Sequence, residues 1–369
     1  MSACPDPSPA ATSPTGSETP SPFLWSDPLR AGHFERWLAA QQAAQGLDLA
    51  SLRMASADAS FRRYFRIDST HGSRIIMDAP PDKEDCAPFA HGAEVLAQAG
   101  LRVPQVLAWD RSQGFMLLQD LGPRTMMQAL QVEQPQANLA LYQQAIDALV
   151  LLQKASRPGV LPAFDRDTML REMELFPQWY LTQHRGRAPD AAMRATLDTS
   201  FHAIADACLA WPTVFVHCDF MPRNLMLPVA GDPRVGVLDF QDALYGPITY
   251  DIGSLMRDAF LSWDEEFVLD ITIRYWEKAR AAGLPVGDDF GNFYRGVEWT
   301  GLQRHLRVTG IFARLTLRDG KPRYLADTPR FIAYMRATAA RYRELKPLLR
   351  LLDQVEGIQE AGGYAFGRV

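Results

Sequence analysis

HCDFMPRNLM, residues 217–226, and GVLDFQDA, residues 236–243, are the two stretches that decide the fold of this chain. Each lies beside a short apolar run that is typical of a β-strand. The two stretches carry the carboxylates of Asp219 and Asp239 and the amide of Asn224. Because buried charges need partners, we expect the segment between the runs to return as a hairpin, so that all three polar groups face one cleft.

These three side chains supply the oxygen atoms that a magnesium site needs. Mg²⁺ chooses oxygen ligands and keeps several waters, so one or two carboxylates together with substrate phosphates can hold it. One acid can then hold the metal while the other orients a hydroxyl nucleophile, which is the division of labour in phosphoryl transfer. The alternative is a β-hairpin whose aspartates are simply solvated at its turns.

Composition limits the classes of protein to which the chain can belong. Its 369 residues allow two or three domain-sized units. The formal net charge of −5 argues against a general nucleic-acid binder, which would be basic. The four cysteines form no C-x-x-C pair, which argues against zinc or thioredoxin-like chemistry and fits a reducing compartment.

The N-terminal segment, residues 1–22, is rich in Pro, Ser and Thr and almost free of large apolar residues. It cannot bury enough apolar surface to offset its ordering entropy, so we expect it to be disordered. We expect it not to be a signal peptide, because the first basic residue of the chain is Arg30 and no apolar region precedes it. No run approaches the roughly 18 apolar residues of a membrane span. We therefore expect a cytoplasmic protein with no membrane partner and no nucleic-acid partner.

Hydrophobic periodicity predicts a β-rich N-terminal part and a mostly helical C-terminal part. Helices are expected at residues 31–45 and 90–101, the second inserted after the third of five strands. The strands are expected at residues 51–55, 61–67, 73–79, 104–110 and 114–120. After a break at residues 121–123 the pattern is helical, except for three β-rich runs within residues 213–239. The later helices are expected at residues 136–155, 167–183, 190–210, 249–260, 264–282, 290–317 and 327–352.

The pattern H-C-D-F-M-P-R-N-L-M with L-D-F-Q-D-A-x-x-G-P-x-x-Y-D resembles small-molecule kinases of the aminoglycoside phosphotransferase and choline kinase type. The resemblance implies a bilobal, protein-kinase-like fold of the α+β class and a reaction that uses ATP and Mg²⁺. Residues 23–120 then form a small antiparallel, nucleotide-binding N-lobe, and residues 121–369 a larger, mainly helical catalytic and substrate lobe. Asp219 is the implied catalytic base, and Asn224 and Asp239 are the implied magnesium ligands.

Three neighbouring residues add detail to this resemblance. His217 is implied to be a structural residue of the loop. Cys218 stands where many protein kinases have an arginine that pairs with a phosphorylated activation loop, so such control is not expected. Gln241 replaces the glycine of the Asp-Phe-Gly motif and removes backbone freedom, which suits a metabolic enzyme with a fixed active conformation.

The match weakens where the N-lobe should bind phosphates. The segment MASADASFRRYFRI, residues 54–67, takes the place of the family's glycine-rich or serine-rich hairpin but has no glycine. Ser60 and Arg62 are expected to approach the phosphates through hydroxyl, amide and charge, although an ordinary hairpin tip is the alternative. No lysine is present near Met77, where the third strand should carry one. Lys83 or another nearby cation takes this role, or Lys83 is one charge on a solvated loop.

Two further nucleotide contacts are implied by the resemblance. Glu94 matches the helix glutamate that pairs with the missing lysine; the alternative, a solvated helix charge, gains weight because that partner is absent. The stretch FMLLQDLG, residues 115–122, matches the connector between the lobes. Backbone groups from Gln119 to Leu121 are therefore expected to bond the adenine edge.

A wider resemblance narrows the acceptor. The runs SFRRYFRI, MDAPPDKED, LRVPQVLAWD and LDFQDALYGPITYDIGSL are similar to those of the bacterial anomeric amino-sugar kinases. These enzymes phosphorylate N-acetylmuramate and N-acetylglucosamine at the C1 hydroxyl during peptidoglycan recycling. The resemblance covers most of residues 50–345 and implies a small-molecule sugar and ATP as the partners.

Charge gives an independent indication of the substrate. From Arg295 to Arg330 the chain has eight Lys or Arg residues and three acidic residues, a net charge of +5. Such a basic stripe suits an anion such as the lactyl carboxylate of N-acetylmuramate, whereas a pocket for a cationic aminoglycoside should be acidic. A solvated helix face is the alternative. On the sugar side we expect Glu172, Arg223 and Arg304.

Two other functions stay open at this point. The same chemistry could act on another small alcohol, such as an aminoglycoside, choline or a homoserine-like amine, although the basic stripe counts against cationic acceptors. The missing lysine also allows a kinase-fold binding protein without activity. The presence of Asp219, Asn224 and Asp239 together favours an active kinase.

Overall fold

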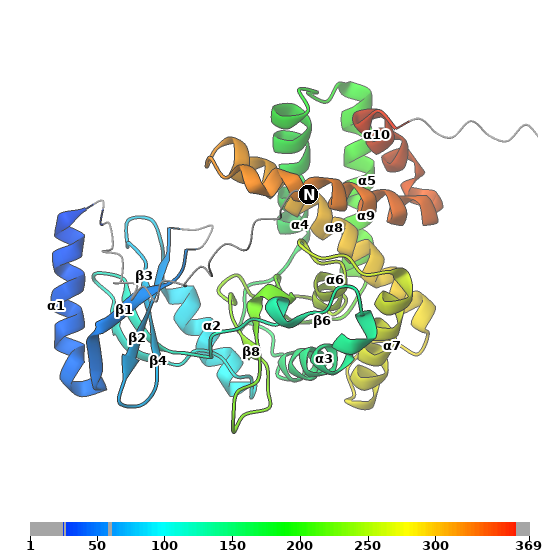
Figure 1. Ribbon diagram of the computed structural model, residues 1–369. Helices are drawn as coiled ribbons and strands as arrows, with labels where there is room; N and C mark the ends of the chain where they lie inside the picture. Colours follow the sequence, from blue (N-terminus) through cyan, green and yellow to red (C-terminus); the bar gives the residue numbers. More distant parts are fainter. Residues whose placement is uncertain (1–24, 26, 58–60, 359–369) are drawn as a thin grey trace, which may run out of the picture.

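The computed structural model describes residue 25, residues 27–57 and residues 61–358. Within these residues the chain forms two lobes, a β-rich lobe from its N-terminal third and a mainly helical lobe from the remainder (Figure 1). This is the two-lobed α+β arrangement that the sequence predicts. The tail predicted to be disordered, residues 1–22, lies outside the described residues.

The N-lobe is built on one antiparallel sheet with the strand order β1-β2-β3-β5-β4. Its strands are β1 (Leu47–Ala57), β2 (Arg63–Ser69), β3 (Arg74–Asp78), β4 (Val106–Asp110) and β5 (Phe115–Gln119). Strands β2 to β5 each contain β-branched or aromatic residues, which pack well on a pleated surface. Helix α2 (Ala87–Gln98) connects β3 to β4. The prediction of five strands with a helix after the third is therefore confirmed.

Helices cover both faces of this sheet (Figure 1). On the outer face lies α1 (Pro28–Gln45), whose Phe34 and Trp37 belong to a buried cluster with aromatic and aliphatic residues of the strands. The fully buried carboxylate of Asp78 accepts a hydrogen bond from Arg30 Nε at 2.8 Å. Because a buried carboxylate needs such a partner, this contact fixes α1 to the end of β3. Helix α2 lies on the other face, between the sheet and the C-lobe.

The C-lobe is mainly helical. Its α-helices are α3 (Leu139–Lys154), α4 (Arg166–Met173), α5 (Ala191–Leu209), α6 (Tyr250–Met256), α7 (Glu265–Ala281), α8 (Phe290–Leu317), α9 (Thr328–Arg341) and α10 (Lys346–Glu356). Short 3₁₀ turns precede α3 at η1 (Met127–Ala129) and η2 (Pro135–Asn138), and others lie between the later helices at η4 (Pro222–Asn224), η5 (Pro322–Asp327) and η6 (Arg343–Leu345). The long helix α8 is buried over most of its length and forms the centre of the lobe.

Two predicted helices are interrupted in the structure. The helix predicted at residues 167–183 is α4 followed by the π-helix η3 (Phe176–His184). Pro177 lacks an N–H group and cannot continue the regular α-helical ladder, so the helix changes its hydrogen-bond pattern there. The helix predicted at residues 327–352 is split into α9 and α10, because the backbone of Tyr342 is extended.

Four short strands lie within the C-lobe: β6 (Thr213–Val216), β7 (Leu225–Met226), β8 (Gly236–Val237) and β9 (Leu244–Pro247). β7 and β8 pair antiparallel, with Leu225 opposite Val237, so the predicted hairpin is confirmed. β6 instead pairs with β9. The sequence pattern misses β9 because its run Leu-Tyr-Gly-Pro contains Gly and Pro, which are rare in strands.

One buried guanidinium connects the two lobes. Arg102 donates to the carbonyl oxygens of Leu121 at 3.1 Å, Leu227 at 2.7 Å and Arg234 at 3.0 Å. Leu121 follows the last strand of the N-lobe, whereas Leu227 and Arg234 lie in the segment that connects β7 to β8. Arg102 therefore holds the C-lobe hairpin against the connector. Across residues 25, 27–57 and 61–358, no helix combines the length and the apolar character that crossing a membrane requires.

Candidate active site

The loop after β6 is held by a buried carboxylate from α6. Asp251 accepts the backbone N–H of His217 at 2.7 Å and that of Cys218 at 3.1 Å. Burial raises the pKa of Asp251 to about 7. Cys218 has a positive φ of 73°, a conformation that is costly for a side chain other than glycine. The two bonds to Asp251 help to maintain this turn, which Asp219 follows directly.

His217 joins the two halves of the motif. Its Nε2 lies 2.9 Å from the carbonyl oxygen of Leu238, and its Nδ1 accepts the backbone N–H of Asp219 at 3.3 Å. Since Nδ1 accepts, the proton is on Nε2 and is donated to the carbonyl. Burial lowers the pKa of His217 to about 4, so the ring is neutral near pH 7. These contacts agree with the structural role that the sequence implies.

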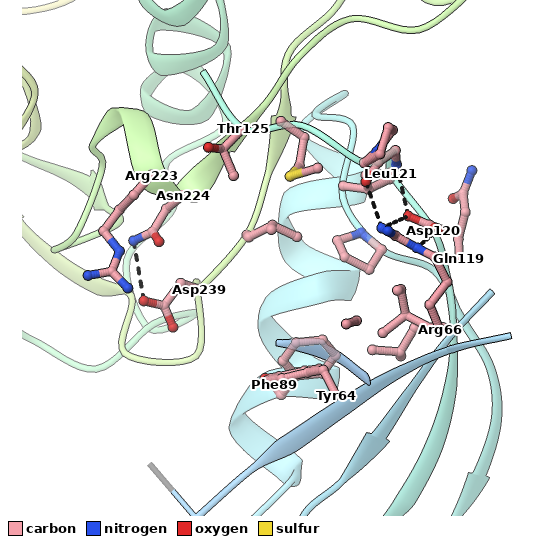
Figure 2. Close-up of a pocket in the computed structure, with 18 of the residues that line it drawn as sticks. Tyr64, Arg66, Phe89, Gln119, Asp120, Leu121, Thr125, Arg223, Asn224 and Asp239 are labelled. Carbon is pink, nitrogen blue, oxygen red and sulfur yellow. Dashed lines mark hydrogen bonds and ion pairs between the residues drawn. The ribbon is translucent and has the colours of Figure 1, made fainter. Parts of the chain in front are cut away.

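The hairpin brings the predicted magnesium ligands together (Figure 2). Asn224 Nδ2 donates to Asp239 Oδ2 at 3.2 Å and to the backbone oxygen of Asp219 at 2.9 Å. Gln241 Nε2 donates to the other oxygen of Asp239 at 2.7 Å. Asp239 also has a positive φ, 65°. A carboxylate oxygen and an amide oxygen that lie close together in a cleft are suitable ligands for Mg²⁺.

Two arginines of α8 determine the electrostatics of Asp219. Burial alone would raise the pKa of Asp219, but the charges of Arg307 and Arg304 lower it below its ordinary value. Arg304 Nη2 lies 3.5 Å from Asp219 Oδ1, and its side chain is only 1% exposed. Asp219 is therefore an ionised carboxylate at neutral pH.

The predicted sugar-side residues Glu172 and Arg223 make separate contacts within the C-lobe. Glu172 Oε1 is 3.3 Å from Arg307 Nε, and Glu172 Oε2 accepts from Gln303 Nε2 at 2.9 Å. Arg223, on the catalytic loop, is exposed and holds its guanidinium 4.6 Å above the centre of the Phe260 ring. Arg307 was missed as an individual residue, although the basic stripe of the sequence contains it.

A cavity of about 370 Å³ lies between the lobes. The C-lobe contributes Asn224 and Asp239 to its wall, and the connector contributes Gln119 and Leu121 (Figure 2). The predicted nucleotide connector and the predicted metal ligands thus face each other across one space.

Arg66 is a cavity residue that the sequence did not reveal. Its Nε lies 2.6 Å from Asp120 Oδ2, and its Nη2 donates to the carbonyl oxygen of Gly122 at 2.9 Å. The side chain therefore links β2 to the connector. An arginine in an alternating strand gives no sequence signal that distinguishes this role from a surface charge.

The residues predicted to contact the phosphates, Ser60, Arg62 and Lys83, differ from one another in their surroundings. Ser60 lies outside the described residues. Arg62 is buried and forms an ion pair with Glu84, with 3.2 Å between Arg62 Nη2 and Glu84 Oε2. Lys83 is exposed and holds its ammonium group 4.9 Å from the centre of the Phe61 ring.

The helix glutamate does not reach the cavity. Glu94 is exposed on α2 and accepts a hydrogen bond from Gln98 at 3.2 Å. It does not belong to the described residues that line the cavity. Met77, at the expected lysine position of β3, is fully buried. The exposed position of Glu94 therefore agrees with the alternative interpretation, a solvated charge on the helix.

A small antiparallel lobe, a helical lobe and an Asp–Asn–Asp cluster at the cleft between them define the class of protein-kinase-like phosphotransferases. The model of the "Phosphotransferase enzyme family" matches residues 51–285, and the chain belongs to this family. It is a small-molecule kinase.

Curated relatives are similar over nearly the whole chain. The N-acetylmuramate/N-acetylglucosamine kinase of Neisseria meningitidis serogroup B is 51% identical over 328 residues, 88% of this chain and 96% of the relative. The kinase of the same name from Pseudomonas aeruginosa is 48% identical over 312 residues, 85% of this chain and 90% of the relative.

Solved structures share the fold at low identity. An ethanolamine kinase of Plasmodium vivax is 13% identical with a TM-score of 0.56, over 83% of this chain and 84% of that one. The aminoglycoside phosphotransferase APH(4)-Ia, in a ternary complex with ADP and hygromycin B, is 16% identical with a TM-score of 0.54. That match covers 82% of this chain and 97% of the other.

Proposed function

We propose that this chain is a cytoplasmic ATP- and Mg²⁺-dependent kinase that phosphorylates the C1 hydroxyl of N-acetylmuramate and N-acetylglucosamine in peptidoglycan recycling. The observation that carries the proposal is the position of Asn224, which bonds the carboxylate of Asp239 and the backbone oxygen of Asp219 and lines the cavity between the lobes together with Asp239. The sugar follows from the 51% identity to a kinase named for these two substrates.

Asp219 is the proposed catalytic base. The lowered pKa of its carboxyl keeps it ionised, and it accepts the proton of the acceptor hydroxyl as the oxygen attacks the γ-phosphorus. A base of low pKa is weak, which suits an anomeric hydroxyl because such a hydroxyl is more acidic than the others of a sugar. The buried Arg304 acts through Asp219 by fixing its orientation and charge.

Asn224 and Asp239 are the proposed magnesium ligands. When bound, Mg²⁺ would neutralise charge on the phosphates. Gln241 holds Asp239 through one carboxylate oxygen and keeps it directed at the cavity. Across the cavity, the backbone from Gln119 to Leu121 would bond the adenine, and Ser60 stays a predicted phosphate contact.

The sugar-side proposal rests on the charges next to Asp219. Arg307 is 14% exposed and Glu172 is 19% exposed, so both can be reached by a ligand. We assign the lactyl carboxylate of N-acetylmuramate to Arg307, with the exposed Arg223 as a second cation. Glu172 would accept hydrogen bonds from sugar N–H or O–H groups.

The test is turnover with a panel of acceptors. The protein is incubated with Mg-ATP and N-acetylmuramate, N-acetylglucosamine, kanamycin or choline, and ADP release is followed. We expect turnover with the two amino sugars, and turnover only with kanamycin or choline would contradict the proposal.

The Asp219→Asn variant is expected to lose at least about 100-fold in kcat, because proton transfer by a positioned base contributes about that much. Its affinity for ATP should be nearly unchanged, which calorimetric titration measures. An active Asp219→Asn protein would refute the assignment of the base.

A further inference from the structure

The N-lobe has no lysine on β3, whose sequence is Arg-Ile-Ile-Met-Asp, yet a triphosphate needs a cation there. Alternate residues of a strand point to the same face. Arg62 directly precedes β2 and continues the face that carries Tyr64 and Arg66. Tyr64 and Arg66 both line the cavity between the lobes, so β2 itself can supply the cation.

The face of β2 runs from the connector towards the catalytic motif. At one end Arg66 is bonded to Asp120 and Gly122 of the connector. Four residues earlier is Arg62, about 13 Å along an extended strand at about 3.3 Å per residue. This length is comparable to the separation between the base and the outer phosphates of an extended nucleotide. Arg62 is not among the described residues that line the cavity, but it continues the strand face whose Tyr64 and Arg66 do line it.

The side chain of Arg62 is held in place by Glu84. The arginine side chain is 8% exposed and its Nη2 lies 3.2 Å from Glu84 Oε2. The backbone N–H of Glu84 donates to the oxygen of Pro80 at 2.9 Å, and Glu84 Oε1 accepts the N–H of Phe61 at 3.1 Å. Both ends of the glutamate are therefore anchored, and the arginine is restricted to one position.

Arg62 also acts across the cleft on the C-lobe. Asp242 follows the candidate metal ligand Asp239 by three residues. Burial raises the pKa of the Asp242 carboxyl; the charges of Arg307 and Arg62 oppose that rise, and the charges of Asp219 and Glu84 add to it. The Arg62–Glu84 pair therefore lies near this segment of the C-lobe.

We propose that Arg62, held by Glu84, is the cation that binds the phosphates of ATP. The pair takes the place of the lysine on β3 and the glutamate on α2 that other kinases use, and it rests on the proposed kinase function. The planar guanidinium can bond two phosphate oxygens at once, which a lysine cannot do with the same geometry.

Nucleotide binding without sugar tests this role. ATP, ADP and adenosine are titrated into the wild-type protein and into Arg62→Gln, Arg62→Lys, Glu84→Gln and Lys83→Gln. We expect Arg62→Gln to weaken ATP and ADP on the order of 10- to 100-fold, the loss expected for a bond to a charged group. Adenosine affinity should be unchanged because it has no phosphate. Arg62→Lys should recover part of the loss, and Glu84→Gln should show a smaller loss of the same kind.

A surface pair of the same hairpin provides the matched control. Arg53 and Asp68 form an exposed ion pair with 2.9 Å between Arg53 Nη2 and Asp68 Oδ1, so Arg53→Gln removes a guanidinium from a carboxylate without touching the cavity. It should leave all three affinities unchanged.

Two outcomes of these titrations would contradict the role of Arg62, and a third would support it. Equal weakening of ATP, ADP and adenosine by Arg62→Gln would show a structural role and overturn the proposal. A selective loss of ATP and ADP in Lys83→Gln, but not in Arg62→Gln, would move the cation to the loop and overturn it too. Selective loss in Arg62→Gln without sugar turnover by the wild type would support Arg62 and contradict only the proposed acceptor.

Discussion

The side chains of Gln241 and Asn224 hold Asp239 in a backbone conformation that is unfavourable for residues other than glycine. A positive φ of 65° costs a residue other than glycine about 1–3 kcal/mol. Gln241 donates to one carboxylate oxygen of Asp239 and Asn224 donates to the other. The glutamine at the position of the usual glycine therefore has a specific contact, and the carboxylate is fixed before any cation arrives.

Replacing Gln241 by alanine should raise the magnesium concentration that gives half-maximal activity. We expect an increase of about 10-fold, because residues that orient a metal ligand typically contribute 10–100-fold to metal affinity. The measurement is the initial rate against Mg²⁺ at saturating ATP.

The matched control for this change is Gln98→Ala, which removes the exposed amide–carboxylate contact between Gln98 and Glu94. It should leave the magnesium dependence unchanged. An unchanged magnesium dependence in the Gln241→Ala protein itself would contradict the role of Gln241.

The catalytic loop and α6 form one unit because of Asp251. The sequence Tyr-Asp-Ile-Gly-Ser-Leu suggests that this acid caps the helix or braces the loop, and the structure shows the brace: both carboxylate oxygens accept N–H groups from the loop. Thr249 occupies the cap position of α6 instead. Local sequence could indicate the element that carries Asp251, but only folding shows which backbone groups face it.

Asp251→Asn should destabilise the protein by about 1–3 kcal/mol, because the amide NH₂ group faces a backbone N–H and leaves a buried donor unsatisfied. The change is measured as a lower midpoint of denaturant unfolding. Asp190→Asn is the control, since Asp190 caps α5 by accepting the N–H of Met193 and asparagine is an equally good cap. Equal stability of the two variants would contradict the role of Asp251.

Elements with a strong local signal could be predicted, and those that depend on neighbours could not. The five strands of the N-lobe follow from short strand-like runs bounded by turn residues, and the β7–β8 hairpin follows from the motif. Strand β9 forms through its pairing with β6. The π-helix η3 contains Pro177, which alters the hydrogen-bond pattern of the helix. Hydrophobic periodicity describes neither effect. Arg304 is a predicted sugar-side residue, and the packing of α8 leaves its side chain 1% exposed and 3.5 Å from Asp219, which the sequence could not show.

The packing of the C-lobe keeps His305 neutral, as it does His217. His305 of α8 is buried, and its Nε2 lies 3.3 Å from the carbonyl oxygen of Arg257. Burial, together with the charge of Arg304, lowers the pKa of His305 from 6.5 to about 3. Between these values the unfolded chain binds more protons than the folded one, so the free energy of unfolding falls as the pH falls.

Removing this group should flatten the acid side of the stability profile. His305→Gln keeps an N–H donor for the carbonyl oxygen but has no proton to gain. Between about pH 6 and pH 4, the slope of its unfolding free energy should be smaller than that of the wild type by up to about 1.4 kcal/mol per pH unit.

Urea unfolding at several pH values measures this slope. The control is His202→Gln, which changes an exposed histidine and should leave the slope unchanged. A slope in His305→Gln equal to that of the wild type would contradict a neutral, buried His305.

The position of the transferred phosphate tests the proposed reaction most directly. The product of N-acetylglucosamine and Mg-ATP is examined by ³¹P NMR with coupling to the sugar protons. A kinase in which Asp219 deprotonates the anomeric hydroxyl gives a phosphorus coupled to the C1 proton, and it gives no product with the analogue that lacks the C1 hydroxyl. Coupling to the C6 protons, or product formation from that analogue, would contradict the account.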